Sequence, residues 1–243
     1  MMITGYFDIH SHILPGVDDG SKDMEMTLQM VDTAYEQGVR TMIATPHYYP
    51  GHKNRSKSEI ETVYKETVSA VSEKYKDFTL LLGNEIYYKT EVVELLKKKE
   101  IFTLADTRYV LVEFSTTAEY RYLYNAVQQL VNNGYYPVLA HVERYQCLYK
   151  KEEKIAELIN AGAYIQTNAE NYRSGLFLAG RSYCMKLIKN GMVHFLGSDC
   201  HNIEERKPDF GNAVDYLEQK IEKKALERLV KENPMQLLEN KCI

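Results

Sequence analysis

The sequence predicts an α/β fold in which seven parallel strands form a barrel-like ring. Short apolar runs alternate with longer amphipathic stretches along the 243 residues, which is the pattern of βα units around a parallel sheet. Ionisable residues stand at the ends of six of the seven apolar runs. The active site of a βα barrel is assembled from the C-terminal ends of many strands, whereas that of an open sheet lies at a switch point between two or three. This spread therefore favours a barrel.

The elements follow one another in strict alternation. The predicted strands are residues 5–10, 40–45, 79–84, 109–114, 136–141, 163–167 and 193–197. The predicted helices are residues 23–37, 56–75, 91–99, 122–132, 152–160 and 176–190, with one or two closing helices over 210–231. Several of them end at a glycine just before the next strand, as at Gly38 and Gly134, which is a usual helix stop. No repeat or linker divides the sequence, so we expect residues 1–243 to form one domain.

Composition and charge exclude several classes of protein. Acidic residues number 34 and basic residues 30, for a net charge of −4, and no basic stripe marks a surface for nucleic acid. No run of about 18 apolar residues predicts membrane insertion, and the first residues lack the features of a secretory signal, so we expect a cytoplasmic protein. The four cysteines stand far apart without a CxxC pair, which predicts reduced thiols.

The N-terminal strand carries the first candidate metal ligands. In the segment YFDIHSH, the period of two in a strand places Asp8, His10 and His12 on one face. Two imidazoles on one face can bind one metal ion. Taken alone, however, such a histidine pair is about equally often a metal site and an ordinary pair of residues. The following loop, LPGVDDG, offers Asp18 and Asp19, which taken alone are most simply explained as a turn and a helix N-cap.

The later strands, apart from the sixth, each bring ionisable groups to their ends. The motifs are TPH, GNE, VLVEF, AHVER and GSDCH, with the residues His47, Glu85, Glu113, His141, Glu143, Arg144, Asp199 and His201. Burying such groups beside apolar strands is costly unless they are paired or coordinate a metal. Imidazole and carboxylate ligands without thiolate suit Mn, Fe, Zn or Mg-like ions and allow more than one metal in a site. The pattern therefore predicts a metal site at the C-terminal ends of the strands.

Other residues that resemble site residues are better explained otherwise. His52 lies in the polar loop GHKNR, where exposure is expected, and His194 stands early in its strand, where a structural role is expected. Cys200 and Arg206 have the Cys-x5-Arg spacing of thiol-based tyrosine phosphatases. That mechanism needs a phosphate loop of backbone N–H groups helped by glycine and positive charge. This segment has no glycine and carries two glutamates, so we do not expect a nucleophilic cysteine.

Together, the motifs DIHSH, LPGVDDG, TPH, GNEIYY, the strand ending in Glu113, AHVERY and GSDCHN resemble the polymerase and histidinol phosphatase (PHP) superfamily. Within it they are most similar to the bacterial capsule-locus tyrosine-protein phosphatases of the CpsB and YwqE type. The motifs run in order from Asp8 to about Pro208, so the resemblance covers nearly the whole chain. It implies a distorted (β/α)7 TIM-like barrel with the metal site at the C-terminal ends of the strands.

The resemblance also implies cofactors and the residues that bind them. It implies three divalent metal ions, with manganese expected first and iron or zinc as alternatives. By position, the ions would be held by His10, His12, Glu85 and Asp199; by Glu85, Glu113 and His141; and by Asp19, His47 and His201. Arg144 would bind the substrate phosphate and act in catalysis. Asp8 is expected to orient one of the histidines on its strand face.

The activity implied by the resemblance is hydrolysis of phosphotyrosine, with water rather than a side chain attacking phosphorus. The substrate would be the tyrosine-rich tail of a bacterial tyrosine kinase that controls capsule or exopolysaccharide synthesis. Two alternatives stay open at this point. One is another phosphomonoesterase of the same fold, such as histidinol-phosphate phosphatase, and the other is a non-catalytic module that uses the fold for binding. The complete ligand set argues against the second.

Overall fold

All seven predicted strands form in the computed structural model, which describes residues 5–172 and 180–243. The second and third are interrupted, and each continues as a second short segment. In chain order the segments are β1 (Tyr6–Ser11), β2 (Val39–Ala44), β3 (His47–Tyr48), β4 (Thr79–Leu82), β5 (Glu85–Tyr87), β6 (Tyr109–Glu113), β7 (Tyr136–Leu139), β8 (Tyr164–Asn168) and β9 (Phe195–Gly197).

The two interruptions lie side by side. Pro46 has no N–H to donate to the ladder and separates β2 from β3, whereas Gly83 and Asn84 separate β4 from β5. The Asn84 side chain donates to the Pro46 carbonyl at 2.8 Å, so each break supports the other. Parallel pairing resumes beyond them, with β2 on β4 below the breaks and β3 on β5 above. The two stretches of sheet therefore form one continuous wall.

The sheet closes on itself between its first and last strands. From β5 onward the order is β5, β6, β7, β8 and β9, all parallel. The Asp199 amide then donates to the His10 carbonyl at 2.8 Å, and the His12 amide donates to the Cys200 carbonyl at 2.9 Å. These bonds join the end of β9 to β1. The predicted distorted barrel is confirmed, and the ligand-bearing segments 10–12 and 199–201 lie at its seam.

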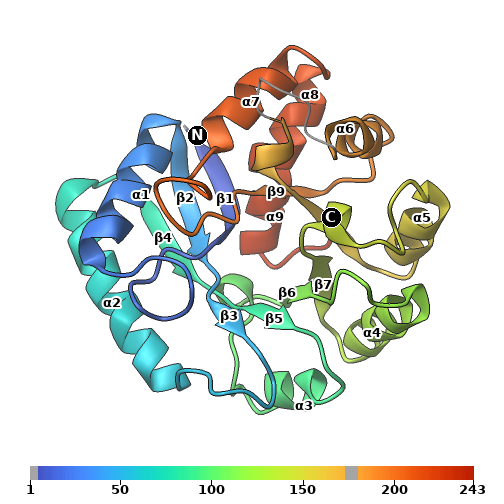
Figure 1. The fold of residues 1–243 in the computed structure, drawn as a ribbon, viewed down its shortest axis with the longest axis horizontal. Coiled ribbons are helices and arrows are strands. Elements are labelled where there is room, and N and C mark those ends of the chain that lie inside the picture. Colours follow the sequence, from blue (N-terminus) through green and yellow to red (C-terminus); the bar gives the residue numbers. More distant parts are fainter. Residues whose placement is uncertain (1–4, 173–179) are drawn as a thin grey trace.

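Most of the helices surround the strands in Figure 1, whereas the last one appears within the ring in this view. The helices are α1 (Met24–Glu36), α2 (Lys57–Lys74), α3 (Val92–Lys97), α4 (Tyr120–Asn132), α5 (Glu152–Asn160), α6 (Arg181–Lys189), α7 (Phe210–Glu218), α8 (Lys223–Glu227) and α9 (Asn233–Leu238), with a π-helical turn at Arg228–Glu232. The start predicted for the sixth helix, residue 176, falls outside the described residues. The prediction that the last helical stretch ends at residue 231 is wrong, because Pro234 stands in the first turn of α9, where no N–H is needed.

Local capping explains where the first two helices begin and end. The Asp23 side chain accepts a hydrogen bond from the Met26 amide at 2.9 Å at the start of α1. Ser56 and Glu59 form a capping box at the start of α2. Gly38 follows α1 with a φ of 90°, a conformation that glycine adopts without strain, so the chain can turn directly into β2.

The apolar core has an inner and an outer part. Inside the barrel, one cluster includes Ile9, Ile43, Leu111, Val138 and Phe195, one residue from each of five strands. The outer cluster packs the strands against the helices. Burial of each such side chain contributes about 1.5–3 kcal/mol. Among the residues described, no helix is long and apolar enough to cross a membrane.

Candidate active site

The first group of predicted ligands converges where β1, β5 and β9 meet. The Nε2 atoms of His10 and His12 are 3.2 Å apart. Each is 3.2 Å from Glu85 Oε2 and 3.5 Å from Asp199 Oδ1. All four side chains are buried. Two imidazoles and two carboxylates thus point at one small volume closed off from solvent.

A second group shares Glu85 with the first. His47 Nδ1 lies 3.1 Å from Glu85 Oε2 and 3.4 Å from Glu113 Oε1. His141 Nε2 approaches the same two carboxylates, at 2.8 Å from Glu85 Oε1 and 3.8 Å from Glu113 Oε2. Glu85 therefore belongs to both groups.

A third group lies nearer the surface. His47 Nε2 is 3.4 Å and His201 Nε2 is 3.5 Å from Asp19 Oδ1, and His12 lies within the same group. The Asp19 side chain is 67% exposed, whereas the carboxylates of the other groups are at most 13% exposed. This group is therefore the one most open to a molecule that arrives from solvent.

The donor atoms fit divalent cations. Glu85 Oε2, Glu113 Oε1, His47 Nδ1 and His201 Nε2 are buried and make no hydrogen bond within the part of the chain that the structure describes. Leaving a buried polar atom unpaired costs about 1–3 kcal/mol, so packing alone does not explain such a concentration at one place. Imidazole nitrogens and carboxylate oxygens are the ligands that Mn, Fe and Zn ions take in proteins.

The carboxylates dominate the electrostatics of the site. Burial alone lowers the pKa of His12, but the hydrogen bond to Asp18 and its charge, followed by those of Glu85, raise that pKa to about 9. Burial also lowers the pKa of His47, and Glu113 together with Glu85 outweighs it and raises the pKa to about 11. A bound cation would compensate the same excess of negative charge.

The rings are oriented by residues that the sequence did not reveal as partners. His12 Nδ1 lies 2.7 Å from Asp18 Oδ2, which also accepts from the His47 amide at 3.0 Å. His10 Nδ1 lies 3.3 Å from Gln166 Oε1, and the same oxygen accepts from the His141 amide at 2.8 Å. Partners of this kind fix the tautomer and direction of a ligating imidazole.

Gln166 belongs to a chain of amides on β8, the strand with no predicted site residue. Its Nε2 donates to Asn168 Oδ1 at 2.9 Å, and Asn168 Nδ2 donates to Asp199 Oδ2 at 2.8 Å. The sequence signal was present as two amides at a spacing of two in the buried strand YIQTN. All seven strands therefore contribute to the site.

Asp8 supports the main chain beside the site. Its Oδ1 accepts from the His10 amide at 3.2 Å and from the Ser198 amide at 2.9 Å. The ring nitrogens of His10 and His12 have other partners, as described above. Asp8 therefore positions His10 through the backbone of β1 and β9, and not by a hydrogen bond to its ring.

Two predicted ligands have left-handed backbone conformations. His141 has a φ of 32° and Asp199 a φ of 53°, where non-glycine residues are uncommon. Each stands two residues beyond the end of a strand, His141 after β7 and Asp199 after β9. Conformations of this kind persist only where surrounding contacts hold them, and they cluster at functional sites.

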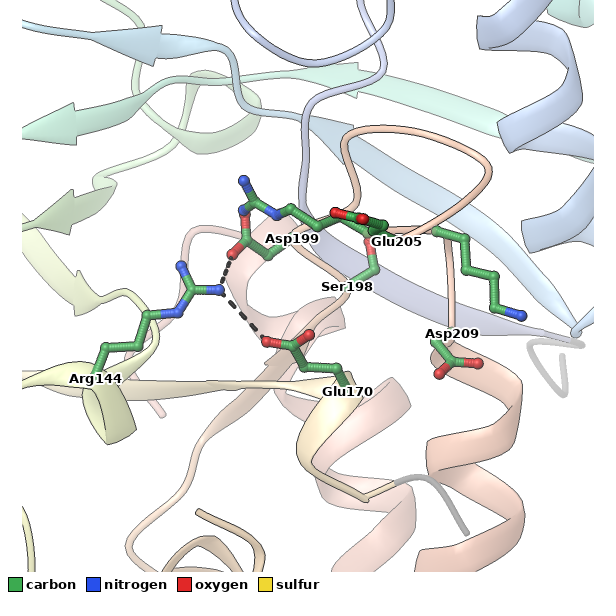
Figure 2. A pocket seen from close by; sticks show the side chains of 8 residues that line it. Arg144, Glu170, Ser198, Asp199, Glu205 and Asp209 are labelled. Atoms are coloured by element: carbon green, nitrogen blue, oxygen red, sulfur yellow. Dashed lines mark hydrogen bonds and ion pairs between the residues drawn. The ribbon is translucent and has the colours of Figure 1, made fainter. Parts of the chain in front are cut away.

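A pocket beside the ligands presents two guanidinium groups. Arg144 Nη2 lies 2.9 Å from Asp199 Oδ2 and 3.5 Å from Glu170 Oε1, as Figure 2 shows. Arg206 Nη2 lies 2.8 Å from Asp199 Oδ1. The two side chains are 35% and 36% exposed, so both can reach an incoming anion. The position of Arg206 was not predicted, since its only sequence signal was the thiol-type spacing.

Three residues set aside at the sequence level have the expected surroundings. Cys200 is fully buried, and burial raises the pKa of its thiol, so it does not form an accessible thiolate. His52 is exposed in its loop. Burial lowers the pKa of His194 to about 4. Its Nδ1 accepts a hydrogen bond from the Ile165 amide at 3.1 Å, which is the role of a neutral ring.

Comparison with known proteins gives consistent matches over nearly the whole chain. The family described as capsular polysaccharide synthesis, CpsB/CapC, matches residues 6–239. Tyrosine-protein phosphatase CpsB of Streptococcus pneumoniae is 34% identical over 241 residues, which cover 97% of this chain and 99% of that protein. The crystal structures of YwqE from Bacillus subtilis and CpsB from S. pneumoniae, described as unique metal-dependent tyrosine phosphatases, include a chain with a TM-score of 0.90 and 30% identity. That match covers 98% of this chain and 96% of the other.

A more distant match shows the fold alone. Histidinol phosphate phosphatase from Lactococcus lactis has a TM-score of 0.54 and 12% identity, over 97% of this chain and 93% of that one.

Proposed function

Because this chain belongs to the CpsB/CapC family of capsular polysaccharide synthesis proteins, we propose that it is a metal-dependent protein-tyrosine phosphatase that acts in capsule synthesis. The observation that carries this function is the convergence of three groups of imidazoles and carboxylates on one barrel mouth. These groups adjoin a pocket with two guanidinium groups and contain no accessible thiol. The single domain expected over residues 1–243 is part of the proposal.

Within this proposal the side chains of these groups would hold three divalent ions, divided among them as the resemblance to the family implies. His10, His12, Glu85 and Asp199 hold the first, Glu85, Glu113 and His141 the second, and Asp19, His47 and His201 the third. Manganese is the proposed metal, with iron and zinc as alternatives that suit the same ligands. Bound divalent ions supply Lewis-acid activation of water and neutralise charge on the phosphoryl oxygens.

The chain's own residues prepare the site for this chemistry. Asp18 and Gln166 hold the rings of His12 and His10, so the ligand atoms keep fixed directions. Arg144 binds the substrate phosphate, because a planar guanidinium can give two parallel hydrogen bonds to two phosphoryl oxygens. To bind the phosphate, Arg144 gives up its ion pair with Glu170. This pair is weak, because its atoms are 3.5 Å apart and both side chains are partly exposed.

The proposed substrate is the phosphotyrosine-bearing tail of a bacterial tyrosine kinase in the cytoplasm. A disordered tail suits a site of this kind, because the groups at the barrel mouth accept one projecting side chain. The histidinol phosphatase alternative has only the shared fold in its favour, at 12% identity.

A substrate panel tests the function. The purified protein is assayed with a phosphotyrosine peptide, the same peptide bearing phosphoserine, and histidinol phosphate, each with manganese and with chelator. We expect hydrolysis of the phosphotyrosine peptide in manganese and none after chelation. Preference for histidinol phosphate, or no hydrolysis of any substrate by metal-loaded protein, would contradict the proposal.

A further inference from the structure

Two tyrosines lie one step farther toward the mouth of the barrel than two of the predicted ligands. Tyr49 follows β3, two residues after His47, and Tyr87 ends β5, two residues after Glu85. Side chains two residues apart in a strand share a face, so these tyrosines point to the same side as the ligands. The intervening residues Tyr48 and Ile86 pack in the outer core, which confirms the alternation.

The sheet register brings the two rings together. β3 and β5 pair in parallel with His47 opposite Glu85, so the next same-face pair along the ladder is Tyr49 and Tyr87. Their ring centroids are 5.5 Å apart at an interplanar angle of 34°. The Tyr49 ring also lies 5.1 Å from the His47 ring. The pair therefore forms a continuous aromatic surface that begins at a predicted ligand and runs toward solvent.

The aromatic surface lies next to Glu113, one of the predicted ligands. Tyr87 is opposite Glu113 in the ladder between β5 and β6. The Tyr49 ring lies beside the His47 ring, and His47 Nδ1 is 3.4 Å from Glu113 Oε1, so Tyr49 stands next to the group that contains Glu113. Both tyrosines are only half-buried. Neither ring is fully enclosed by the fold.

We propose that Tyr49 and Tyr87 form one wall of the substrate pocket and pack against the phenyl ring of the substrate, so that they select aryl phosphates over alkyl phosphates. This inference rests on the proposed phosphatase function. A phosphate that reaches the ligands places the ring of a phosphotyrosine one level above them, which is the level of the two tyrosines. Aromatic rings attract one another at centroid distances of about 4.5–7 Å, so a third ring can join the pair. The shorter side chain of phosphoserine would leave this surface uncovered.

Direct binding to metal-loaded protein tests the wall separately from turnover. Phenylphosphonate and inorganic phosphate are titrated by calorimetry into the parent protein and into Tyr49→Leu, Tyr87→Leu and Tyr49→Phe, with metal content and folding measured in each. The matched control is Tyr135→Leu, a half-buried tyrosine just before β7 at the opposite end of the barrel. Each leucine substitution removes one ring of the pair, so the test stands if only one of the two variants folds.

We expect each leucine variant to bind phenylphosphonate about tenfold more weakly and inorganic phosphate within about twofold of the parent. Tyr49→Phe and Tyr135→Leu should keep the parental preference for phenylphosphonate. Equal losses for the two ligands, or unchanged binding of both, would overturn the inference. Failure of the parent protein to hydrolyse a phosphotyrosine peptide would instead overturn the proposed function, and the binding comparison would remain interpretable.

Discussion

His12 Nδ1 lies 2.7 Å from Asp18 Oδ2, so the ring that faces two of the ligand groups is held from behind by a buried carboxylate. Asp18 also accepts from the backbone amides of His47 and Gly20, both at 3.0 Å. The loop that follows β1 is thereby tied to the start of β3. One carboxylate thus aligns a ring and sets the path of two segments that carry ligands.

We expect Asp18→Asn to weaken metal binding by about 10–100-fold, the usual effect of losing a partner of a ligating histidine. The amide retains the size of the side chain, but it no longer provides the negative charge that stabilises the ring. Metal titration of apo-protein measures the change. Asp77→Asn is the matched control, since that side chain is 63% exposed and lies before β4, at the other end of the barrel. Equal metal affinity in parent and Asp18→Asn would exclude this role.

The ligands could be predicted from the sequence, whereas the role of Asp18 could not. Ionisable residues at the ends of apolar strands were informative because burial of each would be costly without a metal. Asp18 stands in a glycine-containing loop, where a turn explains an aspartate equally well. Gln166 and Asn168 are uncharged, so their burial produces no comparable signal, and only the closed barrel brings them to His10 and Asp199.

The fold shows a similar division. Alternating apolar runs and glycine stops were sufficient to find the seven strands. The break at Pro46 depends on pairing across the sheet, and the last helix begins beside a proline that fits its first turn, so neither boundary follows from the apolar pattern. Arg206 reaches Asp199 only because the loop after β9 folds back, with the His201 amide donating to the Arg206 carbonyl at 2.8 Å.

The amide network on β8 should stabilise the protein as well as the site. We expect Gln166→Leu to lower the free energy of unfolding by about 1–3 kcal/mol, because the buried His141 amide loses its acceptor. Metal affinity should also fall, since the His10 ring loses its partner. Chemical denaturation and metal titration measure the two effects. Gln128→Leu, on the exposed side of α4, is the control and should change neither. A fully stable Gln166→Leu protein would show that the network is dispensable.

Removal of the metal should abolish activity. The described active-site residues include no accessible thiol, and activation of water at this site depends on divalent ions. We expect strong chelation to eliminate turnover of a phosphotyrosine peptide, and addition of manganese to restore it. Metal content is measured by elemental analysis at each step. Full turnover by protein shown to be free of metal would rule out the mechanism.

Cys200 and His201 are neighbours that should respond in opposite ways. Cys200 is fully buried and sits between two predicted ligands, so Cys200→Ser should leave kcat/KM within a few-fold of the parent once folding is confirmed. His201→Ala removes one of the atoms around Asp19, and most of the activity should disappear with it. Steady-state assays at saturating manganese distinguish the two variants. A loss of several orders of magnitude in Cys200→Ser, with metal retained, would revive a thiol mechanism.

Arg144 is expected to hold the substrate phosphate, because its guanidinium is partly exposed and lies against the predicted ligand Asp199. Arg144→Ala should lower kcat/KM by about 10²-fold or more, the scale for loss of one preorganised donor to the transition state. Arg144→Lys should also be impaired, because a point charge cannot give the planar pair of hydrogen bonds. Metal content must remain parental, since loss of a partner of Asp199 could also disturb the first group. Arg108→Ala, at the opposite end of the barrel before β6, is the control. If Arg144→Ala keeps both its metal and near-parental kcat/KM, the phosphate must be bound by the remaining groups, of which Arg206 is the next to test.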